Sequence, residues 1–284
     1  MANKDIILVT GATGKQGGST LGYLAKHGSF QLRAMTRNPD GDAARALKGL
    51  GVELVKGDLD DAASLERAVA GAWGVYAVQN TWEAGVAKEE EQGKRLAKVA
   101  REQRVQQFVY ASVGSAHKAT GIPHFDNKFR VEQTVKALGF PSYAIVRPVF
   151  FMENLLSPMF IQGDKLLTAL APTTKLQMIA ADDIGKFGAR AFIDAQKHKN
   201  VEVDIAGDAV TMVEAAEAAS EILGKKVTYE PIPIEAVRKS SEDIALMLEW
   251  FERIGYSADI ASLEKVWGIR PLALRDWVAT QKKA

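Results

Sequence analysis

The residues best suited to proton chemistry are a histidine and a lysine four positions apart, His124 and Lys128. On a helix, residues at this spacing share one face. An imidazole has an ordinary pKa of about 6.5 and can transfer a proton near neutral pH without help from its neighbours. His124 is therefore a candidate catalytic acid, and Lys128 a candidate hydrogen-bond donor to a sugar hydroxyl. A structural histidine at a helix start, a histidine that only binds a ligand, and a solvated lysine remain alternatives.

A glycine-rich turn near the start of the chain is suited to holding phosphate groups. The apolar run Ile6–Thr10 predicts a buried strand, which leads directly into the turn and then into a helical pattern. In such a motif the first glycine allows a tight turn, the second admits a pyrophosphate, and the third lets helix and strand pack closely. Amide groups and the dipole at the helix start then face the anion. We therefore predict a dinucleotide site, rather than a structural turn, with contacts from Gly11, Thr13, Gly14, Lys15, Gln16 and Gly17.

The end of the second predicted strand indicates which dinucleotide is bound. NAD-specific sites place an Asp or Glu about 20 residues beyond the glycines, where it accepts from the adenosine ribose. No acidic residue occurs between Gly18 and Pro39, and Arg37 stands at the strand end instead. A guanidinium offers planar, charged donors that suit a 2′-phosphate, so the sequence predicts NADP(H). The alternative is that Arg37 is only a solvated charge at the strand end.

Polar residues also follow the third and fourth predicted strands. Asp58 could accept from the adenine amino group while Leu59 packs beside the ring, or Asp58 could cap the next turn. Gln79 and Asn80 come where the ribose on the nicotinamide side would pass, so we expect them to contact the cofactor. Trp82, unusual in a loop, could stack on a ligand or shield the helix that follows.

An apolar run after the sixth predicted strand marks the place where a substrate wall would lie. Within this run we take Phe151 and Asn154 as candidate substrate contacts. Ordinary packing of a helix on the sheet explains Phe151 equally well, and Asn154 could instead cap a turn.

Composition excludes several classes of function. The chain has 284 residues, 47% of them hydrophobic, and a net charge of +1, so we expect neither a nucleic-acid nor a membrane partner. It contains no cysteine, so any redox role requires a bound cofactor. The four histidines lack metal-ligand spacing, and we predict no metal. With no apparent signal peptide and no uninterrupted apolar span, the expected location is the cytoplasm.

The elements that position these residues are predicted by alternating strand and helix patterns. This alternation is typical of a parallel sheet with crossover helices. The sequence therefore predicts an α/β fold of Rossmann type, a doubly wound parallel sheet with ligands at the carboxyl ends of its strands. Strands are expected at Ile6–Thr10, Gln31–Thr36, Glu53–Lys56, Gly74–Ala77, Gln107–Ser112 and Ser142–Arg147. Helices are expected at Gly17–His27, Asp42–Leu50, Ser64–Ala70, Lys88–Glu102 and Phe125–Leu138.

The pattern changes beyond Pro148, where strand signals become sparse and prolines divide the chain into short segments. We expect residues 1–150 to form the cofactor-binding domain. Residues 151–284 are expected to form a smaller C-terminal lobe on the substrate side, interleaved with the last strands of the sheet.

Local signals inside this lobe predict three further elements. A capping box at Thr211–Glu214 predicts a helix that ends at Leu223, before Gly224. A strand is expected over Lys225–Pro231, and another helix over Ser240–Ile254.

The set of motifs resembles the NmrA-like family of atypical short-chain dehydrogenases/reductases. Typical short-chain dehydrogenases carry a catalytic Tyr-x-x-x-Lys, but none of the six tyrosines here has a lysine at that spacing. The resemblance extends over nearly the whole chain and is most specific in the segments around His124 and Arg147. It rests on Gly11–Gly17, Thr36–Pro39, Gly57–Asp58, His124–Lys128, Val146–Asn154 and the ending Leu274–Trp277.

The resemblance implies a Rossmann domain with a small C-terminal lobe, and NADP(H) binding through the glycine motif and Arg37. Some members resemble NADP(H) sensors that contact regulatory partners, and others reduce quinones or related small molecules. We therefore expect an NADPH-dependent reductase of a small hydrophobic carbonyl or quinone, with Lys128 at the ribose and His124 as an optional acid. The alternative is a non-catalytic NADP(H) redox sensor that binds a regulatory protein partner. The substrate, the partner and assembly as a homodimer are left open by the sequence.

Overall fold

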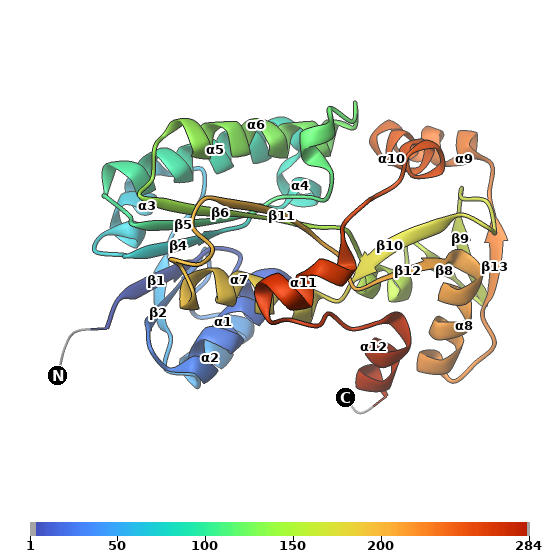
Figure 1. Cartoon of the computed structure of the whole chain (residues 1–284), viewed down its shortest axis with the longest axis horizontal. Helices are drawn as coiled ribbons and strands as arrows, with labels where there is room; N and C mark the ends of the chain where they lie inside the picture. The colour runs from blue at the N-terminus through green and yellow to red at the C-terminus, as the bar shows by residue number, and fades with distance from the viewer. Residues whose placement is uncertain (1–3, 283–284) are drawn as a thin grey trace. The chain divides into compact units, whose positions relative to one another are not determined.

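A seven-stranded sheet forms the centre of the first of two structural units in the computed structural model, which describes residues 4–282 (Figure 1). Its order is β11-β6-β5-β4-β1-β2-β3, and all neighbouring pairs from β6 to β3 are parallel. Because the order runs outward in both directions from β1, the predicted doubly wound α/β fold of Rossmann type is confirmed. The strands are β1 (Ile6–Val9), β2 (Gln31–Thr36), β3 (Glu53–Lys56), β4 (Gly74–Ala77), β5 (Gln107–Ala111), β6 (Ser142–Pro148) and β11 (Val201–Ile205).

Helices cover both faces of this sheet, as crossover connections between parallel strands require (Figure 1). Helices α5 (Val86–Glu102) and α6 (Pro123–Ala137) lie over one face. Helices α1 (Lys15–His27), α2 (Asp42–Lys48) and α7 (Ala181–Ile193) lie over the other. The first unit also contains α3 (Ala62–Val69), which contacts α5, and the short α4 (Thr81–Ala84). Its core combines strand and helix side chains, among them Leu8, Val75, Leu96, Phe108 and Ile145, all fully buried.

The predicted elements of the first half are present, with ends that differ by a few residues. Strands β2, β3 and β4 have the predicted bounds, whereas β1 and β5 end one residue earlier and β6 one residue later. The seventh strand, β11, was not predicted. It contains Glu202 and Asp204 and is only partly buried, so it lacks the continuous apolar run that identifies a buried parallel strand.

The two units exchange segments along the chain. The first unit comprises the chain up to Ser112 together with Asn127–Arg147 and Ile184–Val203. The second comprises Val113–Asp126, Pro148–Asp183 and Asp204–Ala284. This division is more interleaved than a boundary at residue 150, because the segment with most of α7 and the start of β11 returns to the first unit.

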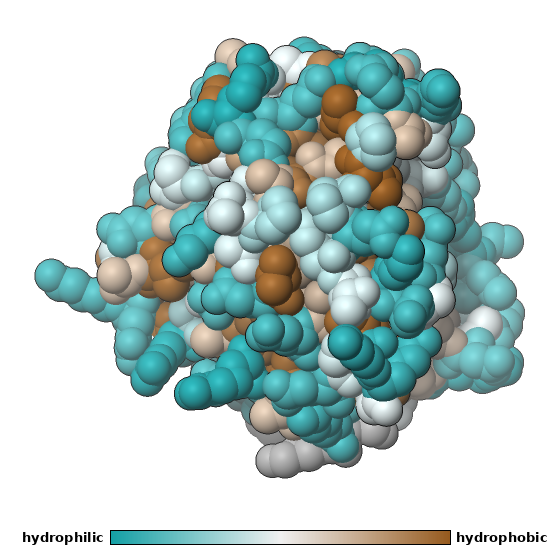
Figure 2. Space-filling model, turned by 90° about the vertical axis from the view of Figure 1, so that its right-hand side faces the viewer, coloured by the Kyte–Doolittle hydropathy of each residue, from teal (hydrophilic) through white to brown (hydrophobic). Residues whose placement is uncertain are grey.

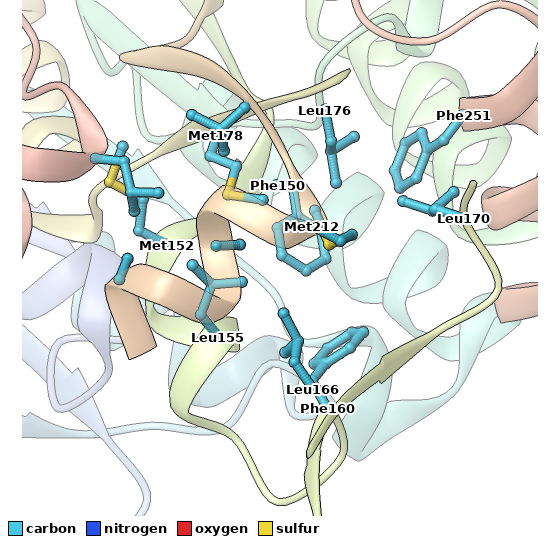
Figure 3. Packing of buried hydrophobic residues seen from close by; sticks show 14 of the residues in the cluster. Phe150, Met152, Leu155, Phe160, Leu166, Leu170, Leu176, Met178, Met212 and Phe251 are labelled. Carbon is cyan, nitrogen blue, oxygen red and sulfur yellow. The ribbon is translucent and has the colours of Figure 1, made fainter. Parts of the chain in front are cut away.

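The second unit contains two small sheets around its own core. One has the order β12-β10-β7 and the other β13-β9-β8, each with one parallel and one antiparallel pair. Figure 3 shows Phe150, Met178 and Met212 among the side chains packed in this core. The strands are β7 (Phe150–Phe151), β8 (Ile161–Gln162), β9 (Lys165–Thr168), β10 (Lys175–Ile179), β12 (Asp208–Thr211) and β13 (Thr228–Pro231).

Two helices of the second unit were expected from the sequence, and the structure contains both among others. The predicted capping box is confirmed at Thr211 and Glu214, and Gly224 closes α8 with a φ of 63°. The helix expected over Ser240–Ile254 is present as Glu242–Arg253, and it begins there because the Ser241 side chain caps it by accepting from the Ile244 amide. The helix that precedes it, Ile234–Ser240, was not predicted. The helices are α8 (Met212–Leu223), α9 (Ile234–Ser240), α10 (Glu242–Arg253), α11 (Ile260–Trp267) and α12 (Leu274–Gln281), with two 3-10 turns, η1 (Ala116–Lys118) and η2 (Met152–Leu156).

A few large apolar side chains of the second unit are exposed. Met159, Val213 and Ile254 are among the exposed large hydrophobic residues. On the face drawn in Figure 2, hydrophilic residues cover most of the surface, and hydrophobic ones occur singly or in small groups. None of the helices within residues 4–282 has the length and apolar character needed to cross a bilayer.

Helix α1 packs against α7 at two glycines of α7. A Cβ added at Gly185 would lie 2.5 Å from the Ser19 Cβ and 2.6 Å from its carbonyl carbon. A Cβ at Gly188 would lie 2.7 Å from a ring carbon of Tyr76 and 2.8 Å from the Thr20 hydroxyl oxygen. The helices can therefore lie this close only because both positions lack a side chain.

We expect Gly185→Ala to lower the free energy of unfolding by about 1–3 kcal/mol, because the added methyl group overpacks the contact with α1. Ser19→Ala should not restore stability, since the Ser19 Cβ and backbone carbon remain in place. Urea denaturation measures the change. Gly22→Ala is the matched control, because a Cβ at Gly22 in α1 meets no atom within 4 Å. This control should be more stable than wild type by about 0.5–1 kcal/mol, and an equal loss in both variants would contradict the packing argument.

Candidate dinucleotide-binding site

In the turn between β1 and α1, neighbouring atoms lie so close to the backbone that two positions accept only glycine. Gly11 has a φ of 57°, and a Cβ there would lie 2.6 Å from Cγ1 of Val78. A Cβ at Gly17 would lie 2.7 Å from both the carbonyl carbon of Gly11 and the carbonyl oxygen of Thr10. The Gly14 amide donates to the Gly11 carbonyl at 2.9 Å and closes the turn. The helix start is therefore held directly against the strand end, as the glycine spacing predicted.

Thr10 ties the ends of β1 and β4 together beneath this turn. Its hydroxyl is fully buried, donates to the Val78 carbonyl at 3.0 Å and accepts from the Val78 amide at 2.9 Å. Sequence reasoning treated Thr10 only as the last residue of an apolar strand. The sequence signal that could have indicated this role is the polar side chain of Thr10 at the end of an otherwise apolar run.

The N-terminus of α1 has the properties of an anion site. Its N-cap is Gly14, which supplies no capping side chain, and its first turn contains no acidic residue. A Cβ at Gly14 would meet only the Gly11 carbonyl oxygen within 4 Å, at 3.2 Å, so the remaining space on that side is open to a ligand. The side-chain oxygen of Gln16 is buried without a hydrogen-bond partner among the described residues. Thr13 and Lys15 are exposed beside the turn, and the whole arrangement fits a pyrophosphate.

Arg37, the residue expected at a 2′-phosphate, follows β2 and forms an ion pair with Glu83 of α4. Both side chains are exposed, at 65% for Arg37 and 50% for Glu83. The chain turns after β2 because the Asn38 amide donates to the Thr36 hydroxyl oxygen at 3.2 Å. Sequence reasoning missed Glu83, because it comes from a different strand connection than the one inspected for an acidic residue.

Asp58 and Leu59 lie in the connection after β3. An oxygen of the Asp58 carboxylate accepts from the Asp60 amide at 3.0 Å, and the Asp58 amide donates to the Ser64 hydroxyl at 2.9 Å. The carboxylate therefore supports the local turn, and its contact with adenine stays a prediction. Leu59 is partly buried against the core of the first unit, and its carbonyl accepts from Arg95 at 2.7 Å.

The residues after β4 differ sharply in environment. Gln79 is buried, and both polar atoms of its side chain lack a hydrogen-bond partner in the part of the chain that the structure describes. A buried amide in this condition is suited to a ligand that supplies the partners. Asn80 instead caps α4 by accepting from the Trp82 amide at 3.1 Å, and Trp82 is 61% exposed.

Lys128 is held by a buried carboxylate that the sequence analysis missed. Its ammonium nitrogen lies 2.5 Å from an oxygen of Glu89, a residue of α5 that is only 1% exposed. The Asn127 side-chain amide donates to the other oxygen of Glu89 at 2.8 Å. The Thr81 hydroxyl also donates to that oxygen. Burial alone would raise the pKa of Glu89, but the charge of Lys128 and these hydrogen bonds hold that pKa below its ordinary value. An ammonium has three N–H groups, so Lys128 retains donors for a sugar hydroxyl.

His124 lies on the same helix, α6, and its environment belongs to the second unit. Its Nδ1 is 2.5 Å from a carboxylate oxygen of Asp243, and its main-chain amide donates to the other oxygen at 3.2 Å. Asp243 stands in the first turn of α10, where the positive end of the helix dipole favours its charge. The sequence analysis missed Asp243, because 119 positions separate it from His124.

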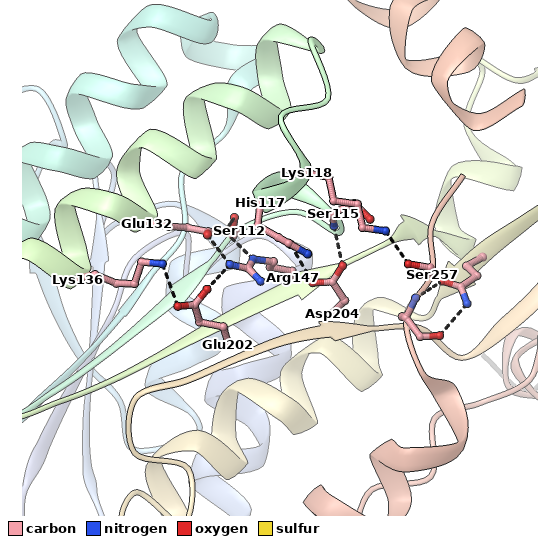
Figure 4. A network of polar contacts seen from close by, with 12 residues as sticks. Ser112, Ser115, His117, Lys118, Glu132, Lys136, Arg147, Glu202, Asp204 and Ser257 are labelled. Carbon is pink, nitrogen blue, oxygen red and sulfur yellow. Dashed lines mark hydrogen bonds and ion pairs between the residues drawn. The ribbon is translucent and has the colours of Figure 1, made fainter. Parts of the chain in front are cut away.

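Arg147, which lies in the motif Val146–Asn154, is a buried structural residue rather than a surface charge. Its guanidinium donates to both oxygens of the fully buried Glu132, at 2.8 and 2.6 Å, and also to Glu202. Ser112 donates to Glu132, and Lys136 donates to Glu202 at 2.9 Å, so all of these side chains converge as Figure 4 shows. The network joins β5, β6, β11 and α6 within the first unit.

The candidate substrate residues are divided between the units. Phe151 in β7 and Asn154 in η2 are partly buried in the second unit, whereas Trp82 belongs to the first. Their neighbours Phe150, Met152 and Leu155 are core residues (Figure 3). The turn glycines, Arg37, Asp58, Gln79 and Lys128 all belong to the first unit, together with the other predicted cofactor residues.

Comparison with known proteins identifies similar chains. The model of the NmrA-like family matches residues 3–280. An NmrA-like family domain-containing oxidoreductase of a Cladobotryum species is 28% identical over 255 residues, which cover 80% of this chain and 76% of the relative.

Two solved structures share the fold. The NADPH-dependent quinone oxidoreductase of Escherichia coli complexed with NADPH has a TM-score of 0.81 and 23% identity, covering 96% of this chain and 99% of that one. The negative transcriptional regulator NmrA in complex with NAD has a TM-score of 0.78 and 23% identity, covering 99% and 95%. An enzyme and a regulator therefore share this architecture, which leaves the choice of function to the site.

We expect Glu89→Gln to lower the free energy of unfolding at pH 7 by about 3 kcal/mol, because it leaves the ammonium of Lys128 without its buried counter-charge. The double variant Glu89→Gln/Lys128→Met removes both charges and should recover most of this loss. Urea denaturation of wild type, both single variants and the double variant measures these effects. If the stability loss of the double variant equals the sum of the losses of the two single variants, the ion pair is contradicted.

The same pair predicts a pH dependence. Because the pKa of Glu89 is depressed in the folded state, its stabilising effect is complete above the ordinary carboxyl pKa of about 4.3. The effect is lost as the pH falls through the depressed value. The stability difference between wild type and Glu89→Gln should therefore shrink as the pH is lowered below about 4.3. A constant difference over this range would be inconsistent with a charged Glu89.

Proposed function

The chain belongs to the NmrA-like family, as its motifs predicted, and we propose that it is an NADPH-dependent reductase of a small hydrophobic carbonyl or quinone. This proposal rests on the turn at Gly11 and Gly17. After this turn, the N-terminus of α1 has no capping side chain, so its free amide groups can bind a pyrophosphate. The relative described as an oxidoreductase and the quinone oxidoreductase of similar fold support the reaction class.

The proposed coenzyme form depends on Arg37. Its exposed guanidinium at the end of β2 can bind a 2′-phosphate with charged, planar donors. Gln79 would supply hydrogen bonds to the nicotinamide half, since both of its polar atoms are buried and unpaired within residues 4–282. Lys128, positioned by Glu89, would donate to the ribose.

His124, together with Asp243, would supply the proton. When bound, the reduced nicotinamide supplies a hydride to the carbonyl carbon or the quinone. With Asp243 at Nδ1, His124 is held in one orientation and would donate a proton from Nε2 to the carbonyl oxygen. A quinone can take its proton from water, so His124 is needed less for that substrate class.

We expect His124→Asn to lower kcat/KM for aldehydes by about 100-fold and to change quinone reduction much less, because only the former depends on the acid. Asparagine can keep a contact with Asp243 without titrating. NADPH consumption at 340 nm with both substrate classes measures the effect. His117→Asn is the control, since His117 is 41% exposed and lies 3.9 Å from Asp204. Equal losses with aldehydes and quinones would reject His124 as the acid.

We expect Arg37→Ala to weaken NADPH binding by about tenfold and to leave NADH binding nearly unchanged, because the lost donors serve the 2′-phosphate. Calorimetric titration of each coenzyme measures this difference. Arg45→Ala removes another exposed arginine, which pairs with Asp42 of α2, and should change neither affinity. If Arg37→Ala leaves the ratio of the two affinities unchanged, the assignment of NADP(H) is wrong.

Coenzyme binding without turnover of any aldehyde or quinone would instead favour the second candidate, a non-catalytic NADP(H) sensor. The observation in its favour is that a transcriptional regulator bound to NAD shares this fold. A partner whose binding depends on the coenzyme would then be sought by pull-down with and without NADPH.

A further inference from the structure

The ion pair between Arg37 and Glu83 bridges two strand connections on either side of the glycine turn. In the sheet, β1 lies between β2 and β4. Arg37 follows β2, and Glu83 lies in α4, which follows β4. The pair therefore reaches across the carboxyl end of β1, where the turn at Gly11 begins. Asn80 fixes the start of α4 and thereby the position of Glu83.

The two charges of this pair favour different coenzymes. A 2′-phosphate needs the guanidinium of Arg37, so it must compete with the Glu83 carboxylate, which also repels the phosphate dianion. A 2′-hydroxyl is an ordinary hydrogen-bond donor to a carboxylate, and acidic residues serve this purpose in NAD-specific sites. The connection after β2 offers no such residue, but Glu83 brings a carboxylate to Arg37 from the other side of β1.

We propose that Glu83 is a second specificity-determining residue, which weakens NADPH binding by competing for Arg37 and strengthens NADH binding by accepting from the adenosine ribose. This inference rests on the proposed dinucleotide function and adds to it a residue that opposes Arg37. The protein then uses both coenzymes with a smaller preference than Arg37 alone would produce.

The size of the effect follows from the exposure of the pair. Both side chains are at least half exposed, so their attraction is partly screened by water and salt. Releasing Arg37 from Glu83 should therefore tighten NADPH binding by about fivefold, which corresponds to about 1 kcal/mol. The gain should decrease as the salt concentration is raised.

The test is calorimetric titration of the full chain with NADPH and with NADH, which requires no turnover. Glu83→Gln should tighten NADPH binding by about fivefold and weaken NADH binding by about threefold. Glutamine keeps the size of the side chain and removes its charge. In the double variant Arg37→Ala/Glu83→Gln, the gain for NADPH should disappear because its cause is the competition for Arg37, whereas the loss for NADH should remain.

Glu53→Gln is the matched control. Glu53 pairs with Arg33 at 2.9 Å between β3 and β2, so this variant also breaks a glutamate–arginine pair of the first unit. It should change neither affinity.

Two results would overturn the inference, and they can be told apart. If wild type binds the coenzymes but Glu83→Gln leaves the ratio of their affinities unchanged, the role of Glu83 is refuted and the dinucleotide site stands. If wild type binds neither coenzyme, the proposed function fails and the role of Glu83 fails with it.

Discussion

The close contact between the start of α1 and the end of β1 is the constraint on which the first unit depends. Gly11 and Gly17 allow this contact, and Gly185 and Gly188 of α7 allow a similarly close approach of α7 to α1. Helix α1 is thus closely packed against both a strand end and a helix. Its N-terminal amides gain a fixed position, which is what an anion site needs if binding is not to be offset by the cost of ordering the site.

A second constraint is the polar face of α6. His124, Lys128, Glu132 and Lys136 follow one another at intervals of four residues, so they share one side of the helix. Each has an ionisable partner from another element: Asp243, Glu89, Arg147 and Glu202. This face of the helix is therefore largely paired in the structure. Because buried charges are costly without partners, these pairs restrict which segments can pack beside α6.

Local patterns were sufficient for most of the first unit and for α8 of the second. Continuous apolar runs identified six strands of the main sheet, and the capping box at Thr211 and Glu214 identified α8, because both signals depend on neighbours in sequence. Strand β11 was missed for the complementary reason, because it lacks an apolar run.

The sequence by itself determined the glycine turn, the strand that precedes it and the arginine after β2, since each depends on the spacing of residues along a short segment. Only the tertiary structure decided what surrounds them. Thr10 is joined to Val78, Lys128 to Glu89, His124 to Asp243 and Arg37 to Glu83, each across 39 or more positions of the chain. The physical reason is that a charge or hydroxyl does not specify its partner through sequence distance. Packing brings the two groups together, and the low polarity around a buried pair makes the pairing necessary.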